Sequence, residues 1–177
     1  MKISENKKDI IQYINDTKDN KNLELEARIT AFISQGTFND VLKRLKGLPT
    51  INKIESEESL DISTYYKSGE RDEQSNIRTT IHGIEAIKKY CRSNDIKEIG
   101  NISFTKKTRV SNTYVKDYNL RFNLKNEEEL PKTHEFIKPM YVEWKGYPKT
   151  FRYKKRFSFT TKDNLFRFDL TIIKSSN

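Results

Sequence analysis

Polar and apolar residues alternate along seven stretches of this chain, and this alternation predicts β-strands. Successive side chains of a strand point to opposite faces, so each stretch has one apolar and one polar side. Asp163-Asn164 suits the turn of a hairpin between the last two strands. The predicted strands cover residues 23–34, 59–66, 76–82, 102–110, 118–125, 150–160 and 165–174.

Three further segments carry apolar residues at helical spacing, over residues 4–16, 37–47 and 85–93. The second begins with a capping-box-like sequence, Thr37-Phe-Asn-Asp40, and is stopped by a glycine and a proline. The pattern predicts three amphipathic helices beside the strands.

Residues 126–149 contain a run of glutamates and three prolines, and they are predicted to form a loop or a short helix. The chain is long enough for one domain. The fold class is therefore predicted to be α+β and mainly antiparallel β over residues 1–177. An N-terminal helix is expected in 1–20, and the strands in 21–177.

The polar face of the predicted strands is mainly basic. An ordinary solvated face mixes lysine with glutamate, because like charges on neighbouring strands repel. A basic face with a small acidic group suits a phosphate chain and a metal ion. If the sheet closes into a barrel, these residues line its interior. The ten basic residues are Arg28, Arg78, Lys107, Arg109, Arg121, Lys125, Arg152, Lys154, Arg156 and Arg167, and the four acidic ones are Glu24, Glu26, Asp61 and Asp169.

Glu24 and Glu26 are two residues apart on one predicted strand, so their carboxylates lie on the same face. Two neighbouring carboxylates repel each other unless a cation lies between them, and a divalent metal with oxygen ligands is a common solution. An ordinary half-buried strand with one solvated face has the same pattern. The pair therefore leaves both interpretations open.

The composition narrows the class of partner. A formal net charge of +9 and a pI of about 9.4 favour a polyanion such as nucleic acid, nucleotide or polyphosphate. The single cysteine, Cys91, excludes an internal disulfide framework and a cysteine-based zinc site. The chain has neither an apolar run of transmembrane length nor a signal sequence, so we expect an intracellular protein without a membrane partner.

Seven motifs occur in a definite order along the chain. They are Glu24-x-Glu26, Asp61-Ile62-Ser63, Arg78, Lys107-x-Arg109, Glu127-Glu128-Glu129-Leu130-Pro131, Arg152-Tyr153-Lys154-Lys155-Arg156-Phe157-Ser158-Phe159-Thr160, and Arg167-x-Asp169-x-Thr171 followed by Lys174-Ser175-Ser176. Together they resemble the triphosphate tunnel metalloenzymes, in particular the RNA triphosphatase domain of mRNA-capping enzymes from giant DNA viruses. The likeness extends from about residue 20 to the end of the chain, and its most specific part is the block that begins at Arg152.

The resemblance implies an eight-stranded tunnel that hydrolyses the γ-phosphate of 5′-triphosphate RNA, the first step of mRNA capping. It implies Mg²⁺ or Mn²⁺ as cofactor, with Glu24 and Glu26 as metal ligands and Asp169 orienting a basic neighbour. Glu24 and Glu26 would also act in catalysis together with Arg152, Lys154 and Arg156. The phosphate-binding residues would be Arg78, Lys107, Arg109, Arg121 and Arg167.

One motif of that family has no counterpart here. The family carries a second E-x-E pair on a late strand, whereas this sequence ends Ile172-Ile-Lys-Ser-Ser-Asn177, and Glu127–Glu129 is predicted to be a loop. The lysine-nucleophile motif of a guanylyltransferase is also missing. We therefore expect either the N-terminal portion of a longer capping enzyme, with its guanylyltransferase and methyltransferase domains as partners, or a naturally short protein with a defective metal site. A fragment, or a chain completed by a partner, is favoured. A viral protein of this kind would act in the viral factory, the host cytoplasm or the virion.

Two alternatives stay open at the level of sequence. A non-catalytic basic barrel that binds RNA or a capping partner would have the same charge pattern. A related tunnel phosphatase could act on inorganic polyphosphate or nucleoside triphosphates, because the chemistry requires only a triphosphate. Arg28, where relatives of that branch tend to have lysine, favours the capping side.

Overall fold

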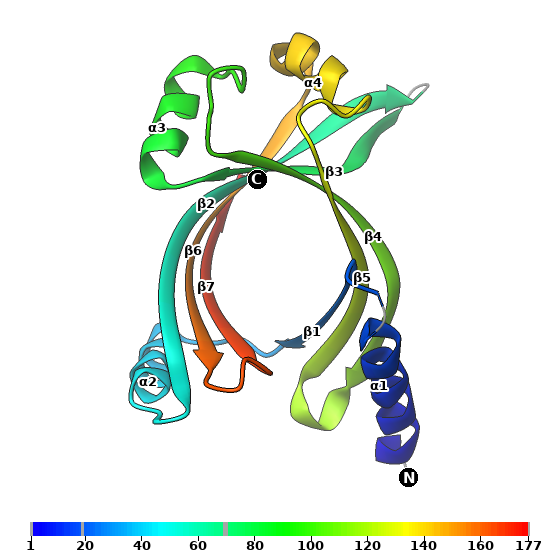
Figure 1. Ribbon diagram of the computed structural model, residues 1–177, viewed down its shortest axis with the longest axis vertical. Coiled ribbons are helices and arrows are strands. Elements are labelled where there is room, and N and C mark those ends of the chain that lie inside the picture. Colours follow the sequence, from blue (N-terminus) through cyan, green and yellow to red (C-terminus); the bar gives the residue numbers. More distant parts are fainter. Residues whose placement is uncertain (1, 19, 69–70, 177) are drawn as a thin grey trace. The chain divides into compact units, whose positions relative to one another are not determined.

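The structure is a computed structural model that describes residues 2–18, 20–68 and 71–176 (Figure 1). Its helices are α1 (Lys2–Lys18), α2 (Gln35–Lys46), α3 (Ile84–Ser93) and α4 (Ile137–Glu143), with short 3₁₀ turns η1 (Lys116–Tyr118) and η2 (Trp144–Gly146). Its strands are β1 (Leu23–Ile29), β2 (Ile51–Ser68), β3 (Arg71–His82), β4 (Ile102–Val115), β5 (Leu120–Leu130), β6 (Lys149–Thr161) and β7 (Arg167–Ser175).

The seven strands form one antiparallel sheet in the order β1-β5-β4-β3-β2-β6-β7. The predicted α+β class and the predicted number of strands are therefore confirmed. The described residues form seven strands where the resemblance implied eight. The chain divides into two compact units, Met1–Phe32 with Thr105–Leu130 (unit 1) and Ile33–Phe104 with Pro131–Asn177 (unit 2). The single domain over 1–177 stays a prediction.

Unit 1 contains α1, β1, β5 and most of β4. β1 pairs with β5 in a register that sets Leu25 opposite Leu124, and Leu124 is buried. Helix α1 is anchored through Tyr13, whose side chain is 9% exposed and whose hydroxyl lies 2.6 Å from Ser111 Oγ and 3.1 Å from Thr113 Oγ1. These bonds hold the helix against β4.

Unit 2 contains the other helices, with β2, β6 and β7 side by side (Figure 1). β2 pairs with β3 on one edge and β6 on the other, and β7 continues the sheet beyond β6. On the apolar face, the Tyr90 ring of α3 packs against Phe151 of β6 and against Trp144, at centroid distances of 6.4 and 6.1 Å. The helices therefore cover the apolar face in this region.

Several predicted boundaries were wrong. The first strand ends at Ile29, not at residue 34, because Ser34 caps α2: its side chain accepts a hydrogen bond from the Thr37 backbone N–H. With Ser34 as its cap, α2 begins at Gln35 and not at the predicted Thr37. The second strand begins at Ile51, eight residues before the predicted 59, because Ile51–Glu58 pairs with β6.

The segment Glu127–Leu130 is strand and not loop, which corrects the prediction for the acidic run. β5 continues to Leu130, and the Glu127 backbone N–H donates to the Asn22 carbonyl at 2.8 Å. β4 likewise continues past residue 110 to Val115. The last strand begins at Arg167, two residues after the predicted start. Cys91, on α3, is exposed.

The predicted separation of apolar and polar side chains onto two faces is confirmed in the central strands. Burial of the apolar face is weaker on β7. Ile62, Ile81 and Phe104 on the apolar side are at most 1% exposed. On β7, Phe168 and Ile172 remain 43% exposed although they are on the same side. The core therefore lies over the central strands. No helix of the described residues is long and apolar enough to cross a membrane.

Candidate active site

Glu26 of unit 1 is an ionised carboxylate held by two cations. Lys125 Nζ donates to Glu26 Oε2 at 2.7 Å, and Arg28 Nη2 donates to Oε1 at 2.8 Å. Burial opposes ionisation, but these hydrogen bonds and charges outweigh it and lower the pKa of Glu26 to about 2. The position on β1 follows from the register that sets Glu26 beside β5.

Glu24 has the opposite environment, because its carboxyl group faces another carboxyl group. Glu24 lies opposite Lys125 and diagonal to Glu127, within hydrogen-bonding reach of the Glu127 side chain. Burial and then the Glu127 charge raise the pKa of Glu24. Burial also acts on Glu127, but a contact from Lys107 outweighs it and lowers the pKa of that group. The pair thus favours one shared proton between its members.

The Glu24–Glu127 pair suits a divalent cation in the chemistry of its donors. Two facing carboxylates that otherwise share a proton offer hard oxygen ligands, and Mg²⁺ is usually bound by one or two carboxylates together with water and substrate phosphates. Among the residues that the structure describes, no group of three or more His, Cys, Asp or Glu side chains is arranged to hold a metal. The donors of this chain therefore fit a partly hydrated ion, with Lys107 and Lys125 as competing cations.

In unit 2, Asp61 is paired with the predicted catalytic residue Lys154 and the predicted phosphate-binding residue Arg78. Its side chain is 3% exposed, and Lys154 Nζ and Arg78 Nη1 lie 2.8 and 3.4 Å from its Oδ2. Thr80 Oγ1 donates to the other carboxylate oxygen at 3.0 Å. Burial would raise the pKa of Asp61, but its bond to Lys154 and the charges of Lys154 and Arg78 lower it. Burial lowers the pKa of Lys154 despite Asp61.

Asp169 lies between two arginines of β6 and β7. Arg167 Nε donates to Asp169 Oδ1 at 2.9 Å, and Arg156 Nη1 lies 3.5 Å from Oδ2. Ser158 Oγ also donates to Asp169, at 2.7 Å. The arrangement follows from the β6–β7 register, which pairs Ser158 with Asp169.

The remaining predicted residues divide between the two units. Arg152 is half-buried on β6, opposite Asp61 of β2. Arg121 contacts Tyr114, with the guanidinium carbon 5.9 Å from the ring centroid, and Arg109 is exposed. Unit 1 contains Glu24, Glu26, Lys107, Arg109 and Arg121, whereas unit 2 contains Arg78, Arg152, Lys154, Arg156, Arg167 and Asp169.

Sequence reasoning placed Glu127 in a loop, and it missed two glutamates of β2 that lie on the polar face. Glu57 is opposite Arg156, and Glu55 is opposite Ser158. Both lie before residue 59, where the second strand was predicted to begin. The residues around them are too polar to show an alternation of apolar and polar side chains. One feature of the sequence did indicate that Glu127 lies in a strand: Leu130 is on the same apolar side of that strand as Leu124.

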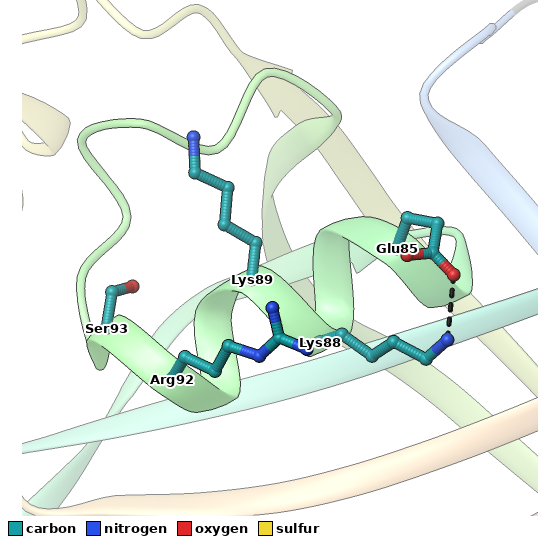
Figure 2. A pocket seen from close by; sticks show the side chains of 5 residues that line it. All are labelled: Glu85, Lys88, Lys89, Arg92 and Ser93. Atoms are coloured by element: carbon teal, nitrogen blue, oxygen red, sulfur yellow. Dashed lines mark hydrogen bonds and ion pairs between the residues drawn. The ribbon is translucent and has the colours of Figure 1, made fainter.

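A surface depression of about 430 Å³ lies on α3 (Figure 2). It is lined by Glu85, Lys88, Lys89, Arg92 and Ser93 of this one helix. Lys88 is bonded to Glu85 at 2.8 Å, and Lys89 donates to the Glu98 carbonyl at 2.9 Å. None of the predicted site residues lines it, so it is not the candidate site.

Solved structures of a viral capping-enzyme domain have a similar fold. A triclinic form of the Mimivirus capping enzyme triphosphatase gives a TM-score of 0.69 at 23% identity, over 96% of this chain and 78% of that chain. The monoclinic form gives 0.68 at 22% identity, with the same coverage of 96% and 78%. The RNA triphosphatase domain of a trifunctional mimivirus mRNA capping enzyme gives 0.66 at 24% identity, over 96% and 77%.

No protein-family model matches the sequence, and no curated protein is significantly similar to it. The likeness is therefore one of fold, and it extends over nearly the whole chain. It agrees with the fold that the sequence motifs implied. This chain has the fold of the Mimivirus capping enzyme triphosphatase.

Proposed function

We propose that this chain is a metal-dependent RNA 5′-triphosphatase, which removes the γ-phosphate from the 5′ end of nascent RNA in the first step of mRNA capping. The observation that carries the proposal is the likeness of its fold to the Mimivirus capping enzyme triphosphatase over 96% of the chain. Its charged residues give that fold the required chemistry. Its partners would be triphosphate-ended RNA and the guanylyltransferase and methyltransferase domains of a longer capping enzyme.

The carboxylates of unit 1 would hold the metal. Glu24 and Glu127 offer the facing oxygen ligands, and Glu26 joins them by releasing Lys125 or Arg28. Mg²⁺ or Mn²⁺ would neutralise charge on the phosphate chain when bound. Lys107, Arg109 and Arg121 of the same unit would contact phosphate oxygens, because guanidinium and ammonium groups bind oxyanions.

The cations of unit 2 would hold the phosphate chain by charge and position. Phosphoryl transfer needs little covalent chemistry from a protein, so positioning and charge neutralisation account for most of the rate. Asp61 positions Lys154 and Arg78, while Asp169 positions Arg156 and Arg167. Arg152 adds a further cation on β6.

A non-catalytic RNA-binding protein is the second candidate, and the pairing of Glu26 favours it. A carboxylate that is already neutralised by Lys125 and Arg28 needs no metal. In such a protein the acidic groups only balance local charge. Removing one would then leave RNA affinity unchanged or improved, because binding to phosphates rises with net positive charge.

Comparing three substrates tests the proposal and its alternatives. Purified chain is given 5′-triphosphate RNA, a nucleoside triphosphate or inorganic tripolyphosphate, and phosphate release is measured with Mg²⁺ or Mn²⁺. An RNA triphosphatase prefers the RNA in kcat/KM. A preference for tripolyphosphate or the free nucleotide would assign the other tunnel activity, and RNA binding without release from any substrate would assign the binding protein.

A further inference from the structure

A chain of hydrogen bonds in unit 2 connects a carboxylate, a histidine and a serine. Glu57 Oε1 of β2 lies 2.6 Å from His82 Nδ1, and His82 Nε2 lies 2.8 Å from Ser103 Oγ of β4. His82 ends β3, between the two other strands in the order of the sheet. The His82 side chain is 32% exposed and that of Glu57 is 44% exposed, so solvent reaches the group.

The partners of His82 determine which ring nitrogen carries the proton. An ionised carboxylate only accepts hydrogen bonds, so Nδ1 donates to Glu57 and the neutral ring leaves Nε2 as an acceptor. Ser103 then donates its hydroxyl proton to Nε2. This is the arrangement by which a histidine accepts a proton from a hydroxyl group, with the carboxylate stabilising the resulting cation.

The same three side chains lie on the face that carries the proposed phosphate-binding cations. Ser59 of β2 is opposite both His82 on β3 and Lys154 on β6, and Glu57 is opposite Arg156. Strands are about 4.8 Å apart, so the Cα atoms of His82 and Lys154 are separated by about 10 Å. The proposed phosphate-binding cation Lys154 therefore lies two strands from His82 on the same face of the sheet.

We propose that Ser103, His82 and Glu57 form the proton-accepting relay for the attacking water. This inference rests on the proposed triphosphatase function. The water oxygen forms a bond to the γ-phosphorus while the bond between that phosphorus and the β–γ bridging oxygen breaks. The water proton passes to Ser103 Oγ as the Ser103 proton passes to His82 Nε2. The diphosphate end leaves as an anion held by cations, and the γ-phosphoryl group becomes inorganic phosphate.

Several groups surround His82. β2 presents Glu57, β4 presents the neutral Ser103 hydroxyl, and the segment before β4 presents Asn101, whose side-chain amide donates to the His82 carbonyl at 3.0 Å. Only the neutral ring of His82 can accept a proton, so the relay predicts a turnover rate that falls on the acid side.

The test measures kcat against pH for metal-dependent phosphate release from triphosphate-ended RNA, in the unchanged chain and in His82→Ala. The relay predicts a fall of about a hundredfold to ten-thousandfold in kcat, loss of the acid limb, and partial recovery with added imidazole. His134 is the other of the two histidines, so His134→Ala is the matched control and keeps the full rate and the acid limb.

Ser103→Ala is a second variant that interrupts the relay but keeps the Glu57–His82 bond. It should lower kcat while leaving the fold, followed by circular dichroism, unchanged. Full rate and an intact acid limb in His82→Ala would overturn the relay alone, as would a rate deficit that imidazole does not relieve. No metal-dependent release by the unchanged chain would overturn the relay together with the proposed function.

Discussion

Glu24 and Glu26 lie on the same side of one strand, yet their environments shift their pKa values in opposite directions. Glu26 receives hydrogen bonds from Lys125 and Arg28, whereas Glu24 faces the carboxyl group of Glu127. The difference arises from the pairing of β1 with β5, not from the E-x-E spacing. Because its pKa is raised, Glu24 is the carboxyl group from which a bound metal ion would displace a proton.

Metal binding at Glu24 is predicted to release a proton. A divalent cation needs ionised carboxylates, and because the pKa of Glu24 is raised, the cation competes with a proton at higher pH than it would at an ordinary glutamate. Calorimetric titration with Mn²⁺ in buffers of different ionisation enthalpy measures the protons released. Release should be largest near the raised pKa of Glu24 and decline above it, while affinity rises with pH.

Glu24→Gln and Glu127→Gln should each weaken Mn²⁺ binding at least about tenfold, because each removes one ionised oxygen ligand. Glu128→Gln is the matched control: Glu128 follows Glu127 on β5 but points to the opposite face. If Glu128→Gln weakened binding as much as Glu127→Gln, the metal would not lie between these carboxylates.

Asp61→Ala is predicted to destabilise the protein by about 3 kcal/mol, because breaking a buried ion pair leaves its partner uncompensated. Lys154, which is only 13% exposed, would lose its bonded carboxylate, and Arg78 would lose its counter-charge. Urea unfolding followed by circular dichroism gives the difference. Ser63→Ala, two residues along the same strand, should change stability much less. Equal effects of both substitutions would show that Asp61 has no special role in the fold.

Glu26 should make the stability of the protein depend on pH in the acid range. Its folded pKa of about 2 is below the ordinary value of 4.5, so its contribution is complete above pH 4.5 and is lost as pH falls toward 2. The group is half-exposed, so we expect about 1 kcal/mol. Unfolding of the unchanged chain and of Glu26→Gln, compared at pH 7 and pH 3, should show the difference shrinking at pH 3. A difference that stays constant would contradict the ion pairs described here.

At the scale of elements, alternation located every strand but not every strand end. The stretch Ile51–Glu58 is polar on both sides, and only its pairing with β6 makes it part of β2. In β5, Asn126 and Glu128 interrupt the apolar side before Leu130 resumes it. The sequence therefore predicted the middle of each strand, where burial of one face requires apolar and polar residues to alternate. It did not predict the strand ends that form only by pairing with a strand distant in the sequence. For this reason Glu57 was not predicted to lie in a strand, and Glu127 was predicted to lie in a loop.

Ser34→Ala is predicted to weaken the first turn of α2. Ser34 accepts from the Thr37 backbone N–H at 3.1 Å, and loss of such a cap costs about 1 kcal/mol. No residue of α2 is buried, so little tertiary packing compensates. Hydrogen exchange of the Thr37 amide should become several-fold faster. Unchanged exchange at Thr37 would mean that the cap contributes nothing in solution.

At the scale of the whole molecule, the segregation of charged and apolar side chains indicated the fold class, and the specific motifs indicated the tunnel-enzyme fold. The structural likeness to the Mimivirus capping enzyme triphosphatase confirms that fold. The order of strands did not follow from alternation, because alternation is the same for any partner. Neither did the pairing of β1 with β5, which determines the environment of both glutamates.

The central claim is that this chain hydrolyses the 5′-triphosphate of RNA with a metal held by Glu24 and its neighbours. The most direct measurement is release of labelled phosphate from γ-labelled triphosphate-ended RNA, with and without Mg²⁺ or Mn²⁺, beside Glu24→Ala. The proposal predicts release that requires the metal and that Glu24→Ala loses. Bound RNA with no release under any condition, or equal release by Glu24→Ala, would contradict it.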